Sequence, residues 1–377
     1  MRVLFITRGS PASIFGLVPL ATSARNAGHE VLMTSTESMM PVLATVGLPA
    51  VPVTSYTEEY FGSHDRDGTP LTFPARGARE QALFGGAWFA RLAATEIARL
   101  REVSADWPPD IVVGGRLDYA APLLAAHLGL PFVRQAVDMG EWSVVDEGAV
   151  EELRPELKDV GLSDLPEPDL SIEVYPPSLR PPGARPARLM RLRPGGTQGQ
   201  LERWMYTRPT RPRICVTPGS RASAEQHFAY VRDLAKTVGS LDADLVVAVP
   251  HALAEVLRPE LPGARVGWIP LDVIAPTCDL FVHHAGGMTS LTALDAGVPQ
   301  LILPEEDATF VLGQRLQDTG AALNIARHEA SPDVIRDACR ELLTQPRFRE
   351  RNRELSREIA ALTPPPGMVG AMEELVT

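Results

Sequence analysis

The sequence predicts an α/β protein built from two doubly wound parallel-sheet domains, and three observations indicate this fold. Residues 2–34 contain a strand, a turn, a helix that stops at Gly28 and a second strand, which is the opening unit of such a sheet. The same order of elements returns after residue 213, behind a stretch rich in proline and arginine. A chain of 377 residues is long enough for two domains, each with its own hydrophobic core.

Short apolar runs alternate with segments of helical periodicity throughout the first half. Residues 55–79 are polar and contain glycine, proline and aromatic side chains, so we expect a long mobile loop there. The predicted strands of this half are 2–7, 29–34, 48–53, 110–114 and 131–135, and the predicted helices are 14–27, 80–104 and 119–128.

Residues 176–213 are rich in proline, arginine and glycine, a composition typical of a linker between domains. The predicted strands beyond it are 214–217, 244–249, 265–268, 280–282 and 299–303, and the predicted helices are 222–238, 288–296, one from about 309, 332–358 and 368–376. We therefore expect an N-terminal domain at 1–195 (linker at about 176–212), a C-terminal domain at 213–360, and a helix within 361–377 that packs back on the first domain.

Composition and charge narrow the class of protein. The formal net charge of -11 disfavours binding to nucleic acid or to an anionic membrane surface. No apolar run approaches the ~20 residues of a membrane-spanning helix, and the chain begins with a strand rather than a signal peptide, so we expect a cytoplasmic protein. The three cysteines are far apart, which indicates buried reduced thiols, and no Cys/His cluster has zinc spacing, so no metal is expected.

The segment around residue 284 has the features of an anion site. A predicted strand at 280–282 leads into His283 and His284, then into Gly286 and Gly287, where a helix begins. The first N–H groups of a helix have no partner within the helix, and they lie at the positive end of its dipole. A histidine ahead of the glycines can add a hydrogen bond to a phosphate oxygen. The simplest ligand is a diphosphate, although two strand-end histidines without a ligand are the alternative.

Two α/β halves, a proline-rich linker and a C-terminal diphosphate site resemble the GT-B glycosyltransferases. The run VGWIPLDVIAPTCDLFVHHAGGMTSLTALDAGVPQLILP resembles the nucleotide-sugar signature of the family that glycosylates macrolides and aromatic polyketides. The opening MRVLFITRGSPASIFGLVPLATSARNAGHEV and the stretch PPSLRP…WMYTR are similar to the olivosyltransferases of angucycline biosynthesis, the urdamycin and landomycin enzymes. The resemblance covers essentially the whole chain. It implies metal-independent, inverting transfer from a dTDP-activated deoxysugar to an aromatic polyketide, and a homodimer is compatible with it.

The resemblance also implies a set of donor-binding residues. The Trp268 indole would lie against the base and the Ile269 backbone would pair with its edge, although a core tryptophan is the alternative. Ser220 would lie beside the donor phosphate or sugar, unless it is only a helix N-cap. The full implied set is Ser220, Arg221, Trp268, Ile269, His284, Gly286, Gly287, Met288, Thr289, Glu306 and Asp307.

One departure from the family pattern concerns the donor sugar. Many relatives carry Asp-Gln where this chain has Ala308 and Thr309, and that pair grips hydroxyls of the sugar. A site built for those hydroxyls would leave polar groups unpaired if the hydroxyls were absent. The replacement therefore fits a deoxygenated sugar such as 2,6-dideoxy-D-olivose, and Glu306 or Asp307 can still reach it.

A second departure concerns the acceptor. Most O-glycosyltransferases of the family have a general-base histidine where this chain has Ser13, and a serine hydroxyl is too weak a base at pH 7. Asp138 follows a strand end and matches the acceptor-activating aspartate of the angucycline enzymes, although it could simply cap a loop. Ser10 and Ser13 would orient the acceptor, or one of them would cap the first helix. The residues expected to line the acceptor site are Pro11, Phe15, Tyr60, Phe61 and Phe84.

The sequence leaves the acceptor atom open, because a phenolate is nucleophilic at oxygen and at its ortho carbon. O-transfer is favoured, since residues 55–65 differ from those of the C-glycosylating relative. A nucleotide-sugar epimerase and a non-catalytic helper protein on the same fold are the alternatives of another class. The absence of GxGxxG disfavours an NAD-linked oxidoreductase.

Overall fold

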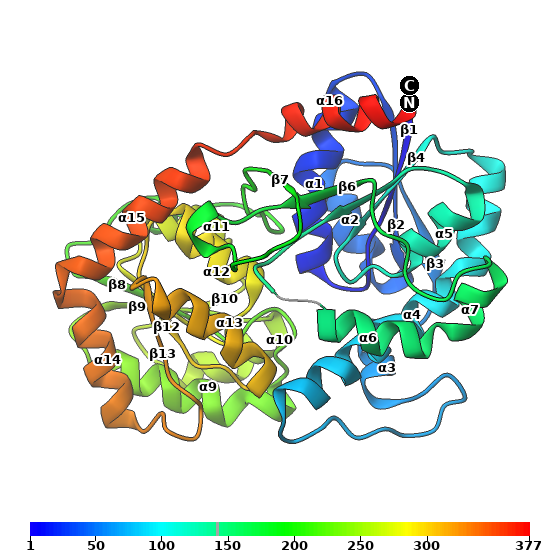
Figure 1. Cartoon of the computed structure of the whole chain (residues 1–377). Coiled ribbons are helices and arrows are strands. Elements are labelled where there is room, and N and C mark those ends of the chain that lie inside the picture. Colours follow the sequence, from blue (N-terminus) through cyan, green and yellow to red (C-terminus); the bar gives the residue numbers. More distant parts are fainter. Residues whose placement is uncertain (141–142) are drawn as a thin grey trace. The chain divides into compact units, whose positions relative to one another are not determined.

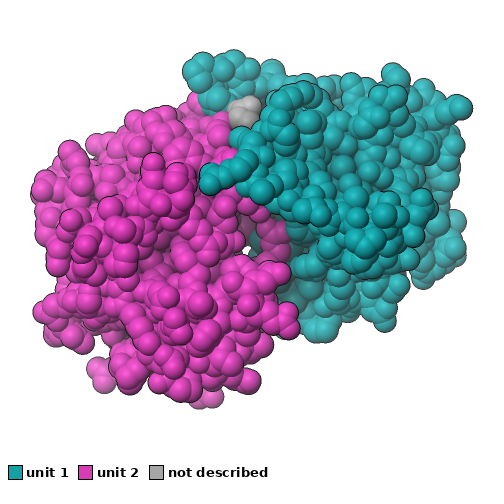
Figure 2. All heavy atoms as spheres, turned by 90° about the horizontal axis from the view of Figure 1, so that it is seen from below, with its two compact units in different colours: residues 1–175, 181–192, 362–377 teal, residues 176–180, 193–361 magenta. Residues whose placement is uncertain are grey.

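The computed structural model describes residues 1–140 and 143–377. The chain forms two compact units, coloured separately in Figure 2. Unit 1 comprises residues 1–175, 181–192 and 362–377, and unit 2 comprises residues 176–180 and 193–361. Each unit contains one parallel sheet with helices packed on it, so the predicted α/β class with two parallel-sheet domains is confirmed (Figure 1).

Unit 1 is built on a seven-stranded sheet in the order β3-β2-β1-β4-β5-β6-β7. All its pairs are parallel, and β1 lies between β2 and β4 with Ile6 level with both Thr34 and Gly114. The strands are β1 Arg2–Ile6, β2 Glu30–Thr36, β3 Ala50–Thr54, β4 Ile111–Gly115, β5 Phe132–Gln135, β6 Leu170–Glu173 and β7 Arg188–Leu189.

The helices of unit 1 pack closely enough to need small residues at their contacts. A Cβ atom on Gly148 of α6 would lie 2.1 Å from the Leu83 carbonyl oxygen of α4, so only glycine fits there. The last helix, α16, contacts α1, and its Glu373 carboxylate lies 2.8 Å from His29 Nε2. The helices are α1 Pro11–Asn26, α2 Met40–Val46, α3 Glu58–Ser63, α4 Ala78–Asp106, α5 Ala120–Leu128, α6 Ser143–Glu152, α7 Arg154–Asp159 and α16 Pro365–Val376.

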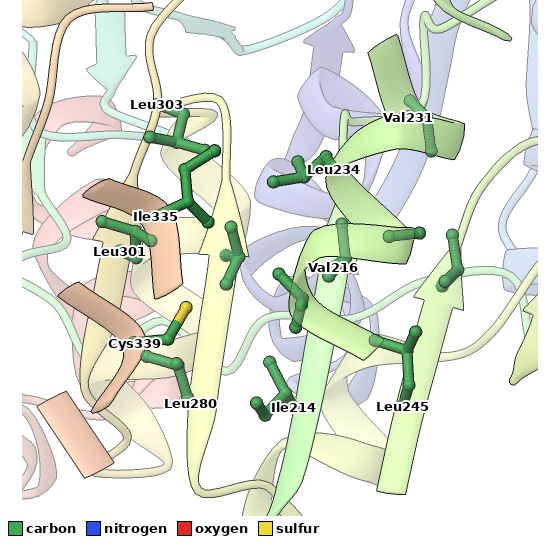
Figure 3. Close-up of a cluster of buried hydrophobic side chains, with 14 of the residues drawn as sticks. Ile214, Val216, Val231, Leu234, Leu245, Leu280, Leu301, Leu303, Ile335 and Cys339 are labelled. Atoms are coloured by element: carbon green, nitrogen blue, oxygen red, sulfur yellow. The ribbon is translucent and has the colours of Figure 1, made fainter. Parts of the chain in front are cut away.

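Unit 2 repeats the strand order in a six-stranded parallel sheet, β10-β9-β8-β11-β12-β13. Its strands are β8 Arg213–Thr217, β9 Asp244–Ala248, β10 Arg265–Gly267, β11 Leu280–His283, β12 Gln300–Ile302 and β13 Ala322–Asn324. Figure 3 shows one face of the sheet, where strand side chains such as Val216 and Leu280 meet Leu234 of α9 and Cys339 of α14. The helices are α8 Arg203–Tyr206, α9 Ala224–Gly239, α10 His251–Leu257, α11 Leu271–Ile274, α12 Gly287–Asp295, α13 Asp307–Asp318, α14 Pro332–Thr344 and α15 Pro346–Ala360.

Several sequence predictions need correction. The segment at 55–79 is not one loop, because Thr57 caps α3 by accepting a hydrogen bond from the Tyr60 N–H, and Glu58 and Glu59 fill the acidic first turn. The segment at 176–213 is not only a linker, because it contributes β7 to the first sheet and α8 to unit 2. The helix predicted at 332–358 is two helices that meet at Pro346.

Other elements were missed or shifted. The sequence analysis did not identify α2, α6, α7, α10, α11, β6 or β13, and it placed the start of α1 at residue 14 instead of Pro11. The three cysteines are buried free thiols, as predicted. Within the described residues, no helix is both long and apolar enough to cross a membrane.

Candidate active site

The same topological feature marks a candidate site in each unit. In open α/β sheets, ligands bind beyond the carboxyl ends of the strands where the strand order reverses. In unit 2 this point lies between β8 and β11, where Thr217 and His283 are level in the sheet. In unit 1 it lies between β1 and β4. The loops that follow these four strands carry several of the residues singled out by the sequence.

A backbone turn between β11 and α12 forms the centre of the site in unit 2. Ala285 has a φ of 72°, and it is the only residue other than glycine with a positive φ in the described part of the chain. Gly286 then caps α12 with extended backbone, and the helix starts at Gly287. The first free N–H groups of α12 therefore belong to the predicted residues Gly287, Met288 and Thr289. Thr289 is 8% exposed, so its hydroxyl lies at the edge of the interior.

His284 is held between two glycine-containing loops. A Cβ atom on Gly219 would lie 2.4 Å from His284 Cε1, and one on Gly286 would lie 2.6 Å from the same atom. The imidazole ring therefore fills space that only glycine leaves open on both sides. Its Nδ1 atom is buried and has no hydrogen-bond partner among the described residues. Burial, with smaller effects from His283 and Arg221, lowers the pKa of His284 to about 4, so the ring is neutral at pH 7.

The turn after β8 lies on the other side of the His284 ring. Gly219 has a φ of 94°, and its N–H donates to Thr217 Oγ1 at 3.2 Å. Ser220 and Arg221 are exposed in the same turn. Ser220 is not the cap of α9, because Ser223 has that role and accepts a hydrogen bond from the Gln226 N–H. The alternative explanation for Ser220, a helix N-cap, is therefore wrong.

Trp268 and Ile269 follow β10 directly. Trp268 is half-buried, and its indole ring lies 6.4 Å from the His251 ring, centroid to centroid, at 30°. Ile269 is 8% exposed and packs in a hydrophobic cluster, so only its backbone is suited to a ligand. The alternative of a core tryptophan does not fit a half-buried indole.

The loop after β12 carries the residues expected near a donor sugar. Glu306 is the N-terminal flanking residue of α13, and Asp307 is the first residue of that helix. The Thr309 hydroxyl donates to the Glu306 carbonyl at 2.9 Å. The Thr309 hydroxyl is thus already hydrogen-bonded within the first turn of α13.

In unit 1, Ser10 and Ser13 are tied into the start of α1. Ser10 is the N-cap and accepts a hydrogen bond from the Ser13 N–H at 3.4 Å. The Ser13 hydroxyl lies within hydrogen-bond distance of two acceptors for its one proton, the carbonyls of Arg8 at 3.0 Å and Ser10 at 2.9 Å. Ser10 is 5% and Ser13 1% exposed. The capping explanation for Ser10 therefore holds, and both serines shape the loop after β1.

Asp138 lies in the loop after β5, which packs on α1. A Cβ atom on Gly16 of α1 would lie 2.4 Å from Val137 Cγ1, and Gln135 Nε2 donates to the Gly16 carbonyl at 2.6 Å. Asp138 is half-buried, and its Oδ1 accepts a hydrogen bond from the Gly140 N–H at 3.0 Å. The loop that carries Asp138 thus packs against α1, and Ser10 and Ser13 lie at the start of that helix.

Three buried carboxyl groups that the sequence analysis missed lie beside the loop after β1. Asp118 accepts hydrogen bonds from the N–H groups of Gly115 at 2.7 Å and Arg8 at 3.1 Å, and the Arg8 guanidinium lies 3.9 Å from Asp118 and from Glu58. Burial raises the pKa of Asp118 to about 6, against the lowering effect of Arg8. Burial and the neighbouring carboxylates raise the pKa of Glu96 well above its ordinary value. Only the position of Asp118 just after a strand end hinted at this cluster.

The residues predicted to line the acceptor site differ in the exposure of their side chains. Phe61 is 2% and Phe15 7% exposed, so both rings contribute mainly to the interior. Pro11, Tyr60 and Phe84 are partly exposed. Tyr60 stacks on His64 with centroids 4.6 Å apart, and Phe84 meets Phe73 edge-to-face at 5.2 Å. Partly exposed aromatic rings near the loop after β1 suit a flat, apolar acceptor.

Two parallel-sheet units of the same strand order, each with candidate site residues in loops beyond the carboxyl ends of its strands, have the architecture of two-domain sugar-nucleotide transferases. Family models for erythromycin biosynthesis protein CIII-like proteins match the chain at residues 22–219 (N-terminal domain) and 232–375 (C-terminal domain). The chain therefore belongs to this family of antibiotic-biosynthesis glycosyltransferases and has the GT-B architecture, as the resemblance implied.

Individual relatives agree with this assignment. The chain is 31% identical over 349 residues to L-demethylnoviosyl transferase of Streptomyces niveus, covering 91% of this chain and 90% of the relative. It is 26% identical over 430 residues to the aclacinomycin-T 2-deoxy-L-fucose transferase of Streptomyces galilaeus, covering 100% and 96%. The structure of glycosyltransferase SsfS6 of Streptomyces sp. SF2575, complexed with thymidine diphosphate, superposes with a TM-score of 0.87 at 32% identity, covering 99% of both chains.

Proposed function

We propose that this glycosyltransferase moves a 2,6-dideoxyhexose, D-olivose, from its dTDP derivative to a phenol of an angucycline-type aromatic polyketide, with inversion at the anomeric carbon. The observation that carries the donor half is the His284 ring, which is held between Gly219 and Gly286 at the start of α12. The presence of thymidine diphosphate in the structure of a relative that is 32% identical supports the choice of nucleotide.

The proposed leaving-group stabilisation uses fixed dipoles. As the bond to the sugar breaks, the diphosphate gains negative charge, which the first N–H groups of α12 meet at the positive end of the helix dipole. The His284 ring is neutral before the diphosphate binds, because burial lowers its pKa to about 4. The charge of a bound diphosphate would favour the protonated ring, so the pKa of His284 rises when the donor binds.

The choice of a deoxysugar rests on the loop after β12. Ala308 cannot hydrogen-bond a sugar hydroxyl through its side chain, and the Thr309 hydroxyl already donates to the Glu306 carbonyl at 2.9 Å. A sugar without a 2-hydroxyl leaves no polar group unpaired against these residues. A relative named as a 2-deoxy-L-fucose transferase supports the same class of donor.

Asp138 is the proposed acceptor-activating group. The Ser13 hydroxyl lies within hydrogen-bond distance of two carbonyls and is 1% exposed, so it does not replace the missing histidine as a base. Asp138 is half-buried in a loop that packs on α1, and a phenol with a pKa near 10 needs less help than an alkanol. The carboxylate takes or polarises the phenol proton while the phenol oxygen attacks the anomeric carbon opposite the diphosphate.

The test is glycosylation of a purified angucyclinone with dTDP-D-olivose by wild type, Asp138→Ala and Asp138→Asn. We expect both variants to lose roughly 100-fold or more in kcat, because general-base catalysis contributes about 10²–10⁴-fold. Asp106→Ala, an exposed aspartate at the end of α4, is the matched control and should keep wild-type rates. Unchanged rates for Asp138→Ala would remove Asp138 from the mechanism.

The same reaction distinguishes the remaining alternatives. An O-olivoside is cleaved by mild acid, whereas a C-olivoside survives, so acid treatment of the product decides the acceptor atom. Conversion of dTDP-olivose to another sugar nucleotide without acceptor would indicate an epimerase. The absence of any reaction, with or without acceptor, would indicate a non-catalytic helper protein.

A further inference from the structure

His283, the last residue of β11, is a buried histidine with both ring nitrogens engaged. It is 2% exposed, its Nδ1 accepts a hydrogen bond from the Ala285 N–H at 3.2 Å, and its Nε2 lies 2.9 Å from Oε1 of Gln300. Because Nδ1 accepts a backbone N–H, the ring proton must reside on Nε2 and be donated to Gln300. Gln300 lies on the adjacent strand β12 and is 0% exposed, so it fixes this tautomer from within the core.

The partner of Nδ1 is Ala285, the one residue other than glycine with a positive φ within residues 1–140 and 143–377. Ala285 has a φ of 72°, which lies in the left-handed region. Residues other than glycine, asparagine and aspartate rarely adopt this backbone conformation. Such a conformation persists only where the surroundings hold it. The hydrogen bond from the Ala285 N–H to His283 fixes the peptide plane about which φ of Ala285 is measured, and Ala285 itself is 3% exposed.

The left-handed residue sets the direction of the chain that follows. Gly286 caps α12, and the helix runs from Gly287 to Asp295. A change of φ at Ala285 would change the direction of the N–H groups of Gly286 and Gly287 relative to the His284 ring, which lies against Gly286. The two adjacent histidines thus have different tasks, since His284 faces the candidate ligand and His283 faces the core.

We propose that His283 is a positioning residue for the diphosphate cradle: its Nδ1 holds Ala285 in the left-handed conformation, which aims the first N–H groups of α12 at the donor. The inference rests on the proposed donor site and goes further by assigning the geometry of that site to one buried hydrogen bond. It also explains why the glycines of the turn begin only at residue 286. A glycine at 285 would adopt the positive φ without strain, and in this chain the hydrogen bond to the His283 imidazole stabilises that φ at an alanine instead.

The experiment measures thymidine diphosphate affinity by calorimetry and thymidine affinity by ligand-observed NMR. His283→Asn keeps an acceptor oxygen near the position of Nδ1, whereas His283→Gln places its amide near Nε2 and leaves the Ala285 N–H without an acceptor. We expect His283→Asn to stay within threefold of wild type for thymidine diphosphate and His283→Gln to weaken it at least tenfold. Thymidine, which lacks the diphosphate, should bind all variants within twofold of wild type.

A second pair of variants tests the role of the backbone. Glycine at 285 adopts a positive φ without strain, so the double variant His283→Gln/Ala285→Gly should recover affinity to within threefold of wild type. His283→Gln/Ala296→Gly adds a glycine at the other end of α12, where φ is -79°, and should not recover. Melting temperatures measured in parallel show whether a variant is folded, and the Asn variant still tests the proposal if the Gln variant fails to fold.

The outcomes separate this inference from the function it rests on. If wild type binds thymidine diphosphate but Ala285→Gly does not restore the His283→Gln variant, the positioning role is wrong and the donor site stands. Equal losses for thymidine and thymidine diphosphate in His283→Gln also overturn it, because a general structural effect would explain them. If wild type itself binds no thymidine diphosphate, the proposed donor fails and this inference fails with it.

Discussion

Substitution of Gly219 by alanine should weaken binding of the nucleotide at the proposed donor site, because the new Cβ atom would collide with the His284 ring. The new Cβ atom would lie 2.4 Å from His284 Cε1 and 2.7 Å from His284 Nε2. Real Cβ contacts are essentially never closer than 3.0 Å, so the ring has to move by roughly half an ångström or more. The backbone at Gly219, with a φ of 94°, adds a cost of about 1–2 kcal/mol for any residue with a Cβ atom.

The expected change in affinity for thymidine diphosphate follows from the hydrogen bond that we propose between the His284 ring and the diphosphate. Losing a hydrogen bond to a charged diphosphate costs about 1.5–3 kcal/mol, which corresponds to roughly 10-fold to 150-fold weaker binding. Calorimetric titration with thymidine diphosphate measures this directly. Gly263→Ala is the matched control in the same unit, because Gly263 has a φ of 93° and nothing lies within 4 Å of an added Cβ atom.

The comparison of the two variants isolates the collision from the backbone strain. In urea unfolding, Gly263→Ala should lose only the stability that the positive φ costs, whereas Gly219→Ala should lose that amount and the cost of displacing the His284 ring. Only Gly219→Ala should lose affinity for thymidine diphosphate. Wild-type affinity in a folded Gly219→Ala protein would refute the assignment of the His284 ring to the diphosphate.

Two further predictions concern stability. Arg213 is 1% exposed and its Nε lies 2.7 Å from Asp244, so Arg213→Met should lower the free energy of unfolding by about 3 kcal/mol in urea titration. Arg211→Met, at an exposed pair with 3.3 Å to Asp242, should change it by less than about 1 kcal/mol, and similar losses in both would contradict this account. For Asp118, burial raises the pKa from 3.8 to about 6, so the folded protein holds this proton more tightly and the contribution to stability is lost as pH rises from about 4 through 6. That difference corresponds to about 3 kcal/mol, and Asp118→Asn should lack this part of the pH dependence in urea unfolding between pH 4 and 7; an unchanged profile would rule out Asp118 as its source.

The sequence by itself predicted the turn between β11 and α12 because the parts of that turn are contiguous in the chain. A strand, two histidines, two glycines and a helix start occur in order from residue 280, and free N–H groups at a helix start need no distant partner to be recognised. The alternation of strands and helices also predicted a parallel sheet in each half, although not the order of its strands. The edge strand β7 was missed because two residues in a proline-rich segment carry no periodic pattern.

Tertiary structure alone decided which groups share a site and which only support it. His283 and His284 are adjacent in sequence, yet one ring contacts Gln300 and the other lies between Gly219 and Gly286. The carboxyl groups of Glu58, Glu96 and Asp118 come from separate helices and loops, and the pKa values of Glu96 and Asp118 are raised only because folding buries them. Local pattern encodes backbone conformation, whereas burial and pairing between distant segments arise only when the chain has folded.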